Sequence, residues 1–191
     1  MKLLALAAAA TACLSLGTGC LWANERSDSM HGFEGRALIG SDGHFEGGQA
    51  HAMAGYAGVY ADLEANVRDA VRPDDPDTHH GIGLGLSLRG SLFGVLATDH
   101  TLERYLDLGA ETGVGGGFVP GVPPHGVAGM SAAWYGAWVE VGTISVGSGY
   151  LALTGGIRRE VFEATWDDQT QLTIGLAWRK REPMGELHFH D

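Results

Sequence analysis

Two pairs of histidines have a spacing that could support metal binding. His79 and His80 are adjacent, and His188 and His190 lie two residues apart near the end of the chain. Side chains at i and i+2 of a β-strand project to one side, so the second pair could chelate a cation together. The sequence places no third or fourth ligand beside either pair. We therefore predict no metal site and no cofactor.

The residue types of a serine hydrolase also occur, since Ser91, His100 and Glu103 lie close together in the sequence. In such enzymes a nearby base activates the hydroxyl for attack. Almost any chain of this size contains such a trio, and no G-x-S-x-G motif is present. The glycine-rich run Gly81–Gly85 alternates with aliphatic residues and lacks the following helix of a phosphate-binding loop. We therefore predict no catalytic residues.

Two acidic clusters have the ligand chemistry of calcium sites. Asp74, Asp75 and Asp77 form the first, and Asp167 with Asp168 forms the second. Calcium prefers carboxylate oxygens, but neither cluster follows a calcium-loop motif. We expect both clusters to be acidic turns. The formal net charge of the whole chain is −11, which disfavours nucleic acid and anionic headgroups as partners.

The elements that would position these residues are organised around the segment Gly81–Ala97. One parity of this segment is aliphatic and the other is small or polar: Ile82, Leu84, Leu86, Leu88, Leu92 and Leu96 against Gly83, Gly85, Ser87, Arg89 and Ser91. A period of two over this length indicates a β-strand with two chemically different faces. Glycine is unusually frequent, at 31 of 191 residues, which suits a small barrel that needs interior space or sharp coiling.

The same alternation recurs along the chain. We predict strands over Phe33–Ile39, Gly55–Val67, Gly81–Ala97, Leu102–Val114, Met130–Gly142, Gly149–Val161 and Thr170–Arg181. The tail Glu186–His190 could supply a short eighth strand. Pro73–His80 is expected to be a hairpin connection, and the proline-rich run Gly115–Gly126 a link that cannot be a central strand.

The segment Gly55–Val67 also admits a helical interpretation. Val59, Leu63, Val67 and Val71 lie at i, i+4 spacing, as on an amphipathic helix stopped by a proline. The period-two pattern has more matches in the same segment, so the strand is favoured. The chain as a whole is then all-β, an antiparallel up-and-down barrel of about eight strands.

The first nineteen residues have the features of an export signal. Met1-Lys2 is positively charged, and the apolar run Leu3–Leu16 is too short to span a bilayer as a helix. Small residues then lead to Cys20, which resembles the lipobox of bacterial lipoprotein signal peptides. That resemblance implies cleavage before Cys20 and lipidation of its thiol. The alternatives are Cys13, or ordinary cleavage near Ala23.

This interpretation divides the chain into three parts. Residues 1–19 are the signal peptide, 20–32 a flexible tether, and 33–191 the β-barrel domain. Without Lys2, 11 basic residues face 23 acidic ones, a net charge of −12. The mature chain keeps one cysteine, so no disulfide framework is possible.

From Arg36 to Arg181 the pattern of strands resembles the small outer-membrane β-barrels of Gram-negative bacteria, which have a lipid-facing apolar band, aromatic girdles and a polar lumen. The resemblance implies that the leucines face lipid and that the opposite parity faces the lumen. Because buried charges must be paired, we expect a lumen charge network of Arg89, Asp107, Glu111 and Arg158.

These observations predict a lipid-anchored outer-membrane protein with a structural or binding role and without catalysis. Its expected partner is membrane lipid, contacted through the anchor and the barrel surface; protein partners are not predicted. An alternative places the leucines in the core of a soluble, lipocalin-like barrel that binds a small apolar ligand. A third is a lipid-modifying barrel enzyme, as some small membrane barrels are.

Overall fold

The structure, a computed structural model, describes residues 28–56, 58–72, 75–99, 102–122, 126–163 and 166–183. Eight strands account for most of them: β1 (Asp28–Gly40), β2 (Phe45–Tyr56), β3 (Val59–Arg72), β4 (Asp75–Asp99), β5 (Leu102–Pro120), β6 (Val127–Val146), β7 (Gly149–Phe162) and β8 (Gln169–Pro183). In this part of the chain we find no helix long and apolar enough to cross a membrane.

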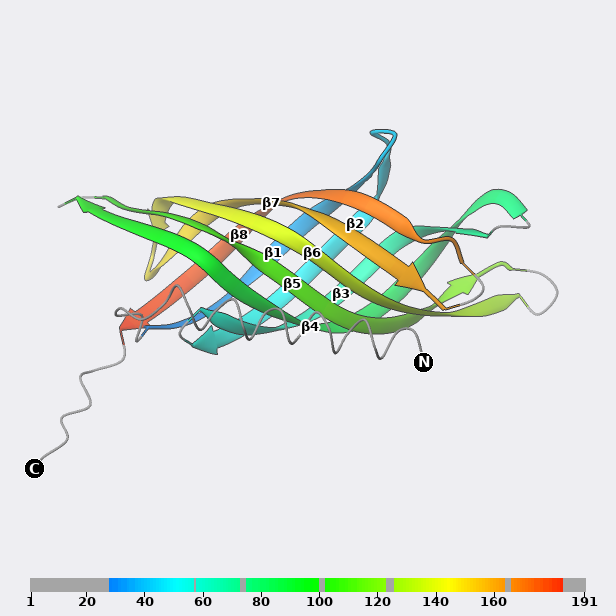
Figure 1. The fold of residues 1–191 in the computed structure, drawn as a ribbon, viewed down its shortest axis with the longest axis horizontal. Helices are drawn as coiled ribbons and strands as arrows, with labels where there is room; N and C mark the ends of the chain where they lie inside the picture. The colour runs from blue at the N-terminus through cyan, green and yellow to red at the C-terminus, as the bar shows by residue number, and fades with distance from the viewer. Residues whose placement is uncertain are drawn as a thin grey trace, which may run out of the picture.

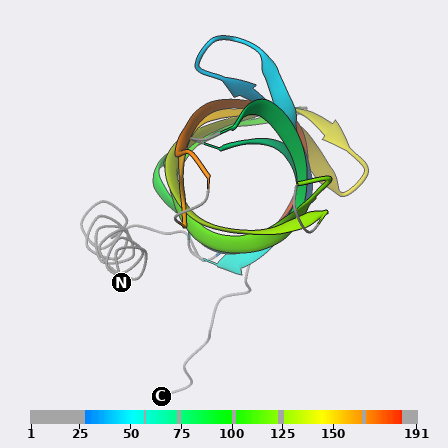
Figure 2. The ribbon, with the colours of Figure 1, turned by 90° about the vertical axis from the view of Figure 1, so that its right-hand side faces the viewer.

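The strands form one closed barrel (Figure 1). Each strand pairs antiparallel with the next, and β1 pairs with β8 from Asp28 opposite Pro183 to Gly40 opposite Gln171. Figure 2, a view along the barrel, shows the resulting ring. Closure leaves neither β1 nor β8 as a free edge that could pair with another chain. The predicted antiparallel up-and-down barrel of eight strands is confirmed.

The two ends of the barrel differ. The short-turn end, on the left of Figure 1, holds the start of β1, the end of β8 and two-residue turns after β2 and β6. Gly58 and Gly147 supply the positive φ angles, 80° and 63°, in these turns. The chain also passes from β4 to β5 at the short-turn end, whereas the loop end, on the right, carries the connections after β1, β3, β5 and β7. In one of them the backbone N–H of His44 donates to Asp42 at 3.0 Å and holds the pKa of that carboxyl below its usual value.

The prediction was wrong near the start of the barrel. β1 begins at Asp28, so part of the predicted tether 20–32 is strand. Most of β2, Phe45–Tyr56, was not predicted, since only its last two residues fall in a predicted strand. This strand completes the set of eight. The tail Glu186–His190, considered for that place, lies outside the described residues.

Two other predicted boundaries also change. The segment Gly55–Val67 is strand and not helix, but the turn at Gly58 divides it between β2 and β3. The predicted link Gly115–Gly126 is strand as far as Pro120. Pro120 occupies the last position of β5, where the sheet tolerates a missing N–H.

The two parities of the Gly81 segment face opposite sides of the barrel wall. Ile82, Leu84, Leu86 and Leu88 point outward and remain 42–64% exposed. Arg89, on the other parity, is 2% exposed and faces the lumen. The alternative prediction placed the leucines in the core of the barrel. It is wrong about which face of the sheet points inward.

Glycines on the inward parity make room for one large aromatic ring. Trp134 of β6 is 1% exposed and fills the lumen beside β4 and β5. A Cβ atom at Gly85 would lie 2.3 Å from Trp134 Cη2, and one at Gly113 would lie 2.5 Å from its Cε2 and Cζ2. Gly115 would come within 3.0 Å of the same ring. Glycine at positions 85, 113 and 115 thus makes room for this tryptophan.

We expect Gly85→Ala to destabilise the barrel by about 1–3 kcal/mol, the usual cost of overpacking a filled interior. Arg158 opposes a shift of the Trp134 ring, because its guanidinium carbon already lies 4.0 Å from the ring centroid. The midpoint of urea unfolding, followed by circular dichroism, measures the change. Gly35→Ala is the control, because its Cβ would meet no atom within 4 Å. Equal midpoints for the two variants would contradict the packing argument.

Candidate functional site

The lumen concentrates the charged side chains of the barrel. Twelve of them are 5% exposed or less: Glu34, Asp62, Glu64, Asp107, Glu111, Glu140 and Glu160 among the acids, and Arg36, Arg68, Arg89, Arg158 and Arg179 among the bases. Burying an unpaired charge costs several kcal/mol. The alternation along each strand places all these charges inside, and antiparallel pairing brings opposite signs together.

The first centre of the lumen is Arg89 on β4. Its guanidinium lies 2.8 Å from Glu34, 2.5 Å from Asp62 and 3.4 Å from Glu111. Arg36 contacts the same Glu34 and lies 3.2 Å from Glu111. Two arginines and three carboxylates from β1, β3, β4 and β5 therefore form one ionic cluster.

A histidine connects this cluster to the rest of the lumen. His51 Nδ1 lies 2.9 Å from Asp62 Oδ2 and 3.1 Å from Arg89 Nη2. Its Nε2 is 3.3 Å from Gln49, and Gln49 donates to Glu64 at 3.1 Å. The polar contacts thus continue along β2 without interruption.

The second centre is Arg158 on β7. It lies 2.6 Å from Glu64 and 2.7 Å from Glu160. Its guanidinium carbon also sits 4.0 Å above the ring of Trp134, a cation–π contact. Arg68 contacts Glu160 from the loop end. The charge of each arginine is therefore met on several sides by carboxylate or aromatic groups.

The third centre is Arg179 on β8. It lies 2.7 Å from Glu140 on β6 and 2.7 Å from Glu34 on β1. Glu34 therefore contacts three arginines, Arg36, Arg89 and Arg179. Through this carboxylate the lumen network joins the first strand to the last.

Apolar side chains close the network at both ends. Toward the loop end lies a buried cluster of Ala70, Val119, Val122, Met130, Ala132, Phe162 and Trp166. Toward the short-turn end, Met30 and Met53 pack on Tyr60. Eight-stranded barrels are just wide enough to be filled by side chains. This lumen is accordingly a packed ionic core.

The structure places the four predicted lumen residues on the inside of the barrel. Arg89 and Glu111 contact each other directly. Arg158 belongs to the second centre, with Glu64 and Glu160 as its partners. Asp107 accepts a hydrogen bond from the hydroxyl of Ser91 at the short-turn side.

Sequence reasoning missed most of the partners of these residues. Glu34 and Arg36 flank an outward residue on β1, and Asp62 and Glu64 flank Leu63 on β3. The same parity rule that selected Arg89 would have found them. Their strands were predicted, but their charges were not assigned to the lumen.

The candidate catalytic residues do not form a described site. Ser91 is fully buried and donates its hydroxyl to Asp107. His100 lies outside the described residues, as does the side chain of Glu103. In the described geometry, Ser91 therefore serves as a buried hydrogen-bond donor to Asp107.

The described candidate metal ligands, His79 and His80, contact different neighbours and do not share a site. His79 packs edge-on against Trp166 with ring centroids 6.3 Å apart, and His80 lies 2.6 Å from Asp69. His188, His190 and Asp74 lie outside the described residues. Within the described ranges, no group of three or more His, Cys, Asp or Glu side chains could hold a metal ion.

The second acidic cluster belongs to the connection between β7 and β8. Asp168 pairs with Arg159 at 3.3 Å and accepts the backbone N–H of Phe162 at 3.2 Å. These contacts close the turn, in agreement with the expectation of an acidic turn.

The outer surface is the chemical opposite of the lumen. All eight strands contribute exposed large apolar residues, including Phe33, Leu63, Leu84, Val114, Val139, Leu153 and Ile174. On β3, the outward run from Val59 to Val67 is entirely apolar. Charged groups described on the outer face lie toward the two ends of the barrel, Asp69 and Arg159 toward the loop end and Lys180 toward the short-turn end. An apolar band therefore surrounds the barrel.

Comparisons with known proteins show a similarity of fold. No family model matches the chain, and no curated protein sequence matches it. Among solved structures, the chain is similar to Neisserial surface protein A (NspA), with 14% identity and a TM-score of 0.43. The match covers 82% of this chain and 96% of that chain. No functional statement about this chain follows from it.

We expect Arg158→Met to destabilise the barrel by about 3–5 kcal/mol, because it leaves Glu64 buried without its arginine and Glu160 with Arg68 alone. The neighbouring variant Arg159→Met is the matched control. Arg159 points outward to a half-exposed pair with Asp168, so its loss should cost about 1 kcal/mol or less. Urea-unfolding midpoints compare the two variants, and equal losses would show that the lumen pairs are not what stabilises the barrel.

Proposed function

We propose that this protein is a lipid-anchored barrel embedded in the bacterial outer membrane, with a structural or binding role and without catalysis. The observation that carries the proposal is the inverted distribution of side chains, apolar outside and ionic inside. In water, the exposed aliphatic band would stay hydrated, and the favourable free energy of removing apolar surface from water would not be gained. In a bilayer, the same band faces hydrocarbon while the charges stay paired in the lumen.

Strand length supports the membrane location. The strands contain 12 to 25 residues, and about 9–11 tilted residues cross a bilayer. Closure supports it as well, because an open sheet edge in hydrocarbon would leave backbone groups without partners. Aromatic residues Tyr56, Tyr135 and Trp178 add the type of side chain that such barrels place at the interfaces.

The two ends suggest an orientation. In bacterial membrane barrels the short turns face the periplasm and the longer loops face outward. The short-turn end here also holds the start of β1 at Asp28, eight residues after Cys20. A lipid on Cys20 would then insert in the periplasmic leaflet, on the same side as the short turns.

The packed lumen limits the possible roles. Arg89 and Arg158 occupy its middle together with Trp134, so the barrel does not suit an open pore or an apolar ligand cavity. The buried position of Ser91 does not support a lipid-modifying site either. Any binding role falls to the outer wall or to the two rims.

Fractionation of membranes with an alkaline carbonate wash tests the location. We expect both the wild type and Cys20→Ser to remain in the membrane pellet, because the barrel is held by its own apolar band. Labelling with radioactive palmitate should mark the wild type and not Cys20→Ser. Release of Cys20→Ser as a folded soluble protein would contradict the embedded barrel, and labelling of both proteins would contradict lipidation at this cysteine.

A charge on the outer wall gives a sharper test. Leu86 is 64% exposed on the outer face of β4, so Leu86→Arg should cost about 2–4 kcal/mol if this position lies near the bilayer midplane. Unfolding of the protein in phospholipid vesicles measures this cost, with Leu86→Ala as the control. In a water-soluble barrel the arginine would be harmless at such an exposed position, so an unchanged stability argues against insertion.

A further inference from the structure

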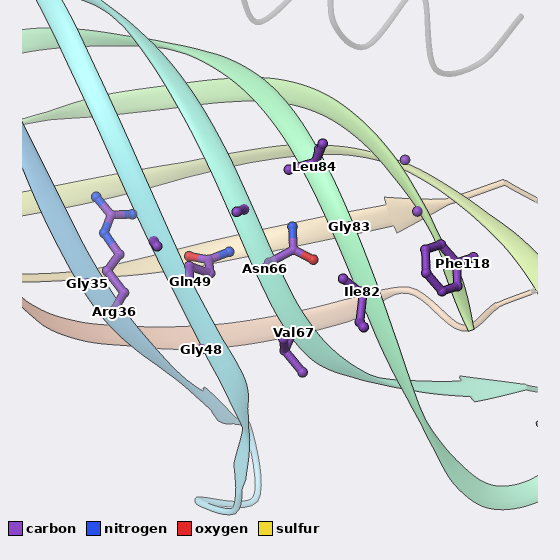
Figure 3. Close-up of a pocket in the computed structure, with 14 residues that line it drawn as sticks. Gly35, Arg36, Gly48, Gln49, Asn66, Val67, Ile82, Gly83, Leu84 and Phe118 are labelled. Carbon is purple, nitrogen blue, oxygen red and sulfur yellow. The ribbon is translucent and has the colours of Figure 1, made fainter. Parts of the chain in front are cut away.

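The tip of the β1–β2 hairpin, residues 41–46, extends past the strands on either side of it. The ladder with β8 ends at Gly40, opposite Gln171, and the ladder with β3 begins at Gly47, opposite Arg68. Figure 2 shows this hairpin, in blue, standing out from the ring, and Figure 3 shows its strands continuing past Gly48 to the tip. The ladders of the sheet therefore do not hold the tip against the rim.

One pair of side chains links the tip to the rim. Gln171 of β8 is fully buried, and its amide nitrogen donates to Glu46 Oε2 at 2.8 Å. The same nitrogen donates to Gln169 Oε1 at 3.2 Å, so both of its N–H groups have acceptors. The amide oxygen of Gln171 has no hydrogen-bond partner among the described residues. A buried carbonyl oxygen without a donor is unfavourable, so a donor beside this amide would stabilise the contact.

Negative charges surround the carboxyl group of Glu46. Asp42 in the tip, Asp69 on β3 and Glu160 on β7 all disfavour a second negative charge at this position. If the ladder between β2 and β3 continued one residue past Gly47, Glu46 would lie opposite Asp69. Like charges in that relation destabilise a sheet. The ionised form of Glu46 is therefore poorly accommodated when the tip lies on the rim.

The cationic groups beside these acids already have acidic partners. The pairs are Arg68 and Arg158 with Glu160, His44 with Asp42 at 2.9 Å, and His80 with Asp69 at 2.6 Å. No such pair between Glu46 and a cationic side chain occurs in the described ranges. Its described hydrogen bond comes from a neutral amide.

The environment of Glu46 alters its acidity. Gly48 lies opposite Val67, the last residue of the outward apolar run on β3, so Glu46 lies beyond the apolar band. Partial burial is the largest cause of a raised pKa of the Glu46 carboxyl. The hydrogen bond from Gln171 opposes this rise, and the three neighbouring acids add to it.

We propose that Glu46 and Gln171 form a pH-sensitive switch that docks the tip on the rim in acid. Glu46 takes a proton from solvent, and its new O–H group donates to the amide oxygen of Gln171. The amide nitrogen still donates to the carboxyl group, so both ends of the buried amide have partners. Ionised Glu46 has no O–H group and keeps its charge beside three acids. The tip then leaves the rim, and the carboxylate is hydrated.

The direction of the response follows from proton binding. The docked tip binds the proton of Glu46 more tightly than the free tip does, because the pKa is raised only in the docked position. Docking is therefore favoured as the pH falls through this raised pKa, and the full effect is reached below the usual pKa of a glutamate. The switch involves the loop end alone and does not depend on the proposed membrane location.

Electron paramagnetic resonance of a nitroxide at Ser41 measures the docking. The full-length chain, with Cys13 and Cys20 replaced by serine, carries Ser41→Cys or, as the control position, Ser148→Cys. Both serines are exposed in turns, but Ser148 lies at the short-turn end. In detergent, between about pH 7.5 and about pH 4, we expect the mobile component of the Ser41 spectrum to decrease. The spectrum at Ser148 should not change.

Two variants assign the response to the proposed pair. Glu46→Gln is neutral at every pH and offers a donor and an acceptor to Gln171, so the Ser41 label should be immobile over the whole range. Gln171→Leu removes the buried amide, so the label should remain mobile in acid. Circular dichroism of each sample reports whether the barrel is folded.

Three results would overturn the switch. A pH response that persists in Glu46→Gln would assign the titration to another group. Unchanged mobility of the Ser41 label in the otherwise unsubstituted barrel would show that the tip does not respond to pH. An equal response at Ser148 would show that the whole barrel responds to acid.

Discussion

The pairing of buried charges in the lumen is the constraint on which the rest of this barrel depends. Seven carboxylates and five guanidiniums lie inside, and none of these ions could be buried alone without a cost of several kcal/mol. Glu34 shows how the fold meets this condition, because its single carboxylate contacts arginines from β1, β4 and β8. The contacts require a register that brings these strands' inward residues to the same level. The network therefore favours this register of the strands, because a shifted register would leave buried charges without partners.

The same parity rule explains the outer surface. Every residue directed outward is flanked by residues directed inward, so a strand that supplies Arg89 to the lumen also supplies Leu88 to the outside. Glycine resolves the remaining conflict of volume. Where Trp134 crosses the lumen, Gly85 and Gly113 remove the side chains that would collide with it. The glycines at these positions are thus a consequence of packing a large ring inside a barrel of only eight strands.

Alternation in the sequence was sufficient for the barrel, for most of its strands and for the inward direction of Arg89. It was not sufficient for β2, whose outward residues, such as Ala50 and Ala52, are too small to give a hydrophobic period. Nor could it give the partners of Arg158, because Glu64 lies 94 residues away and meets it only after the ring closes. Pairings of this kind are set by closure and shear, which no local pattern contains.

The contact between Glu34 and Arg179 joins positions 145 residues apart, and it has a consequence for the order of assembly. Non-local contacts must overcome loop-closure entropy before they contribute, which slows folding. Until β8 arrives, Glu34 and Glu140 lack one of their arginines, and β1 lacks its second neighbour. A barrel missing its last strand would hold both an open edge and unbalanced charges. The native state therefore forms in a late step, when β8, the last strand in the chain, pairs with β1 and closes the barrel.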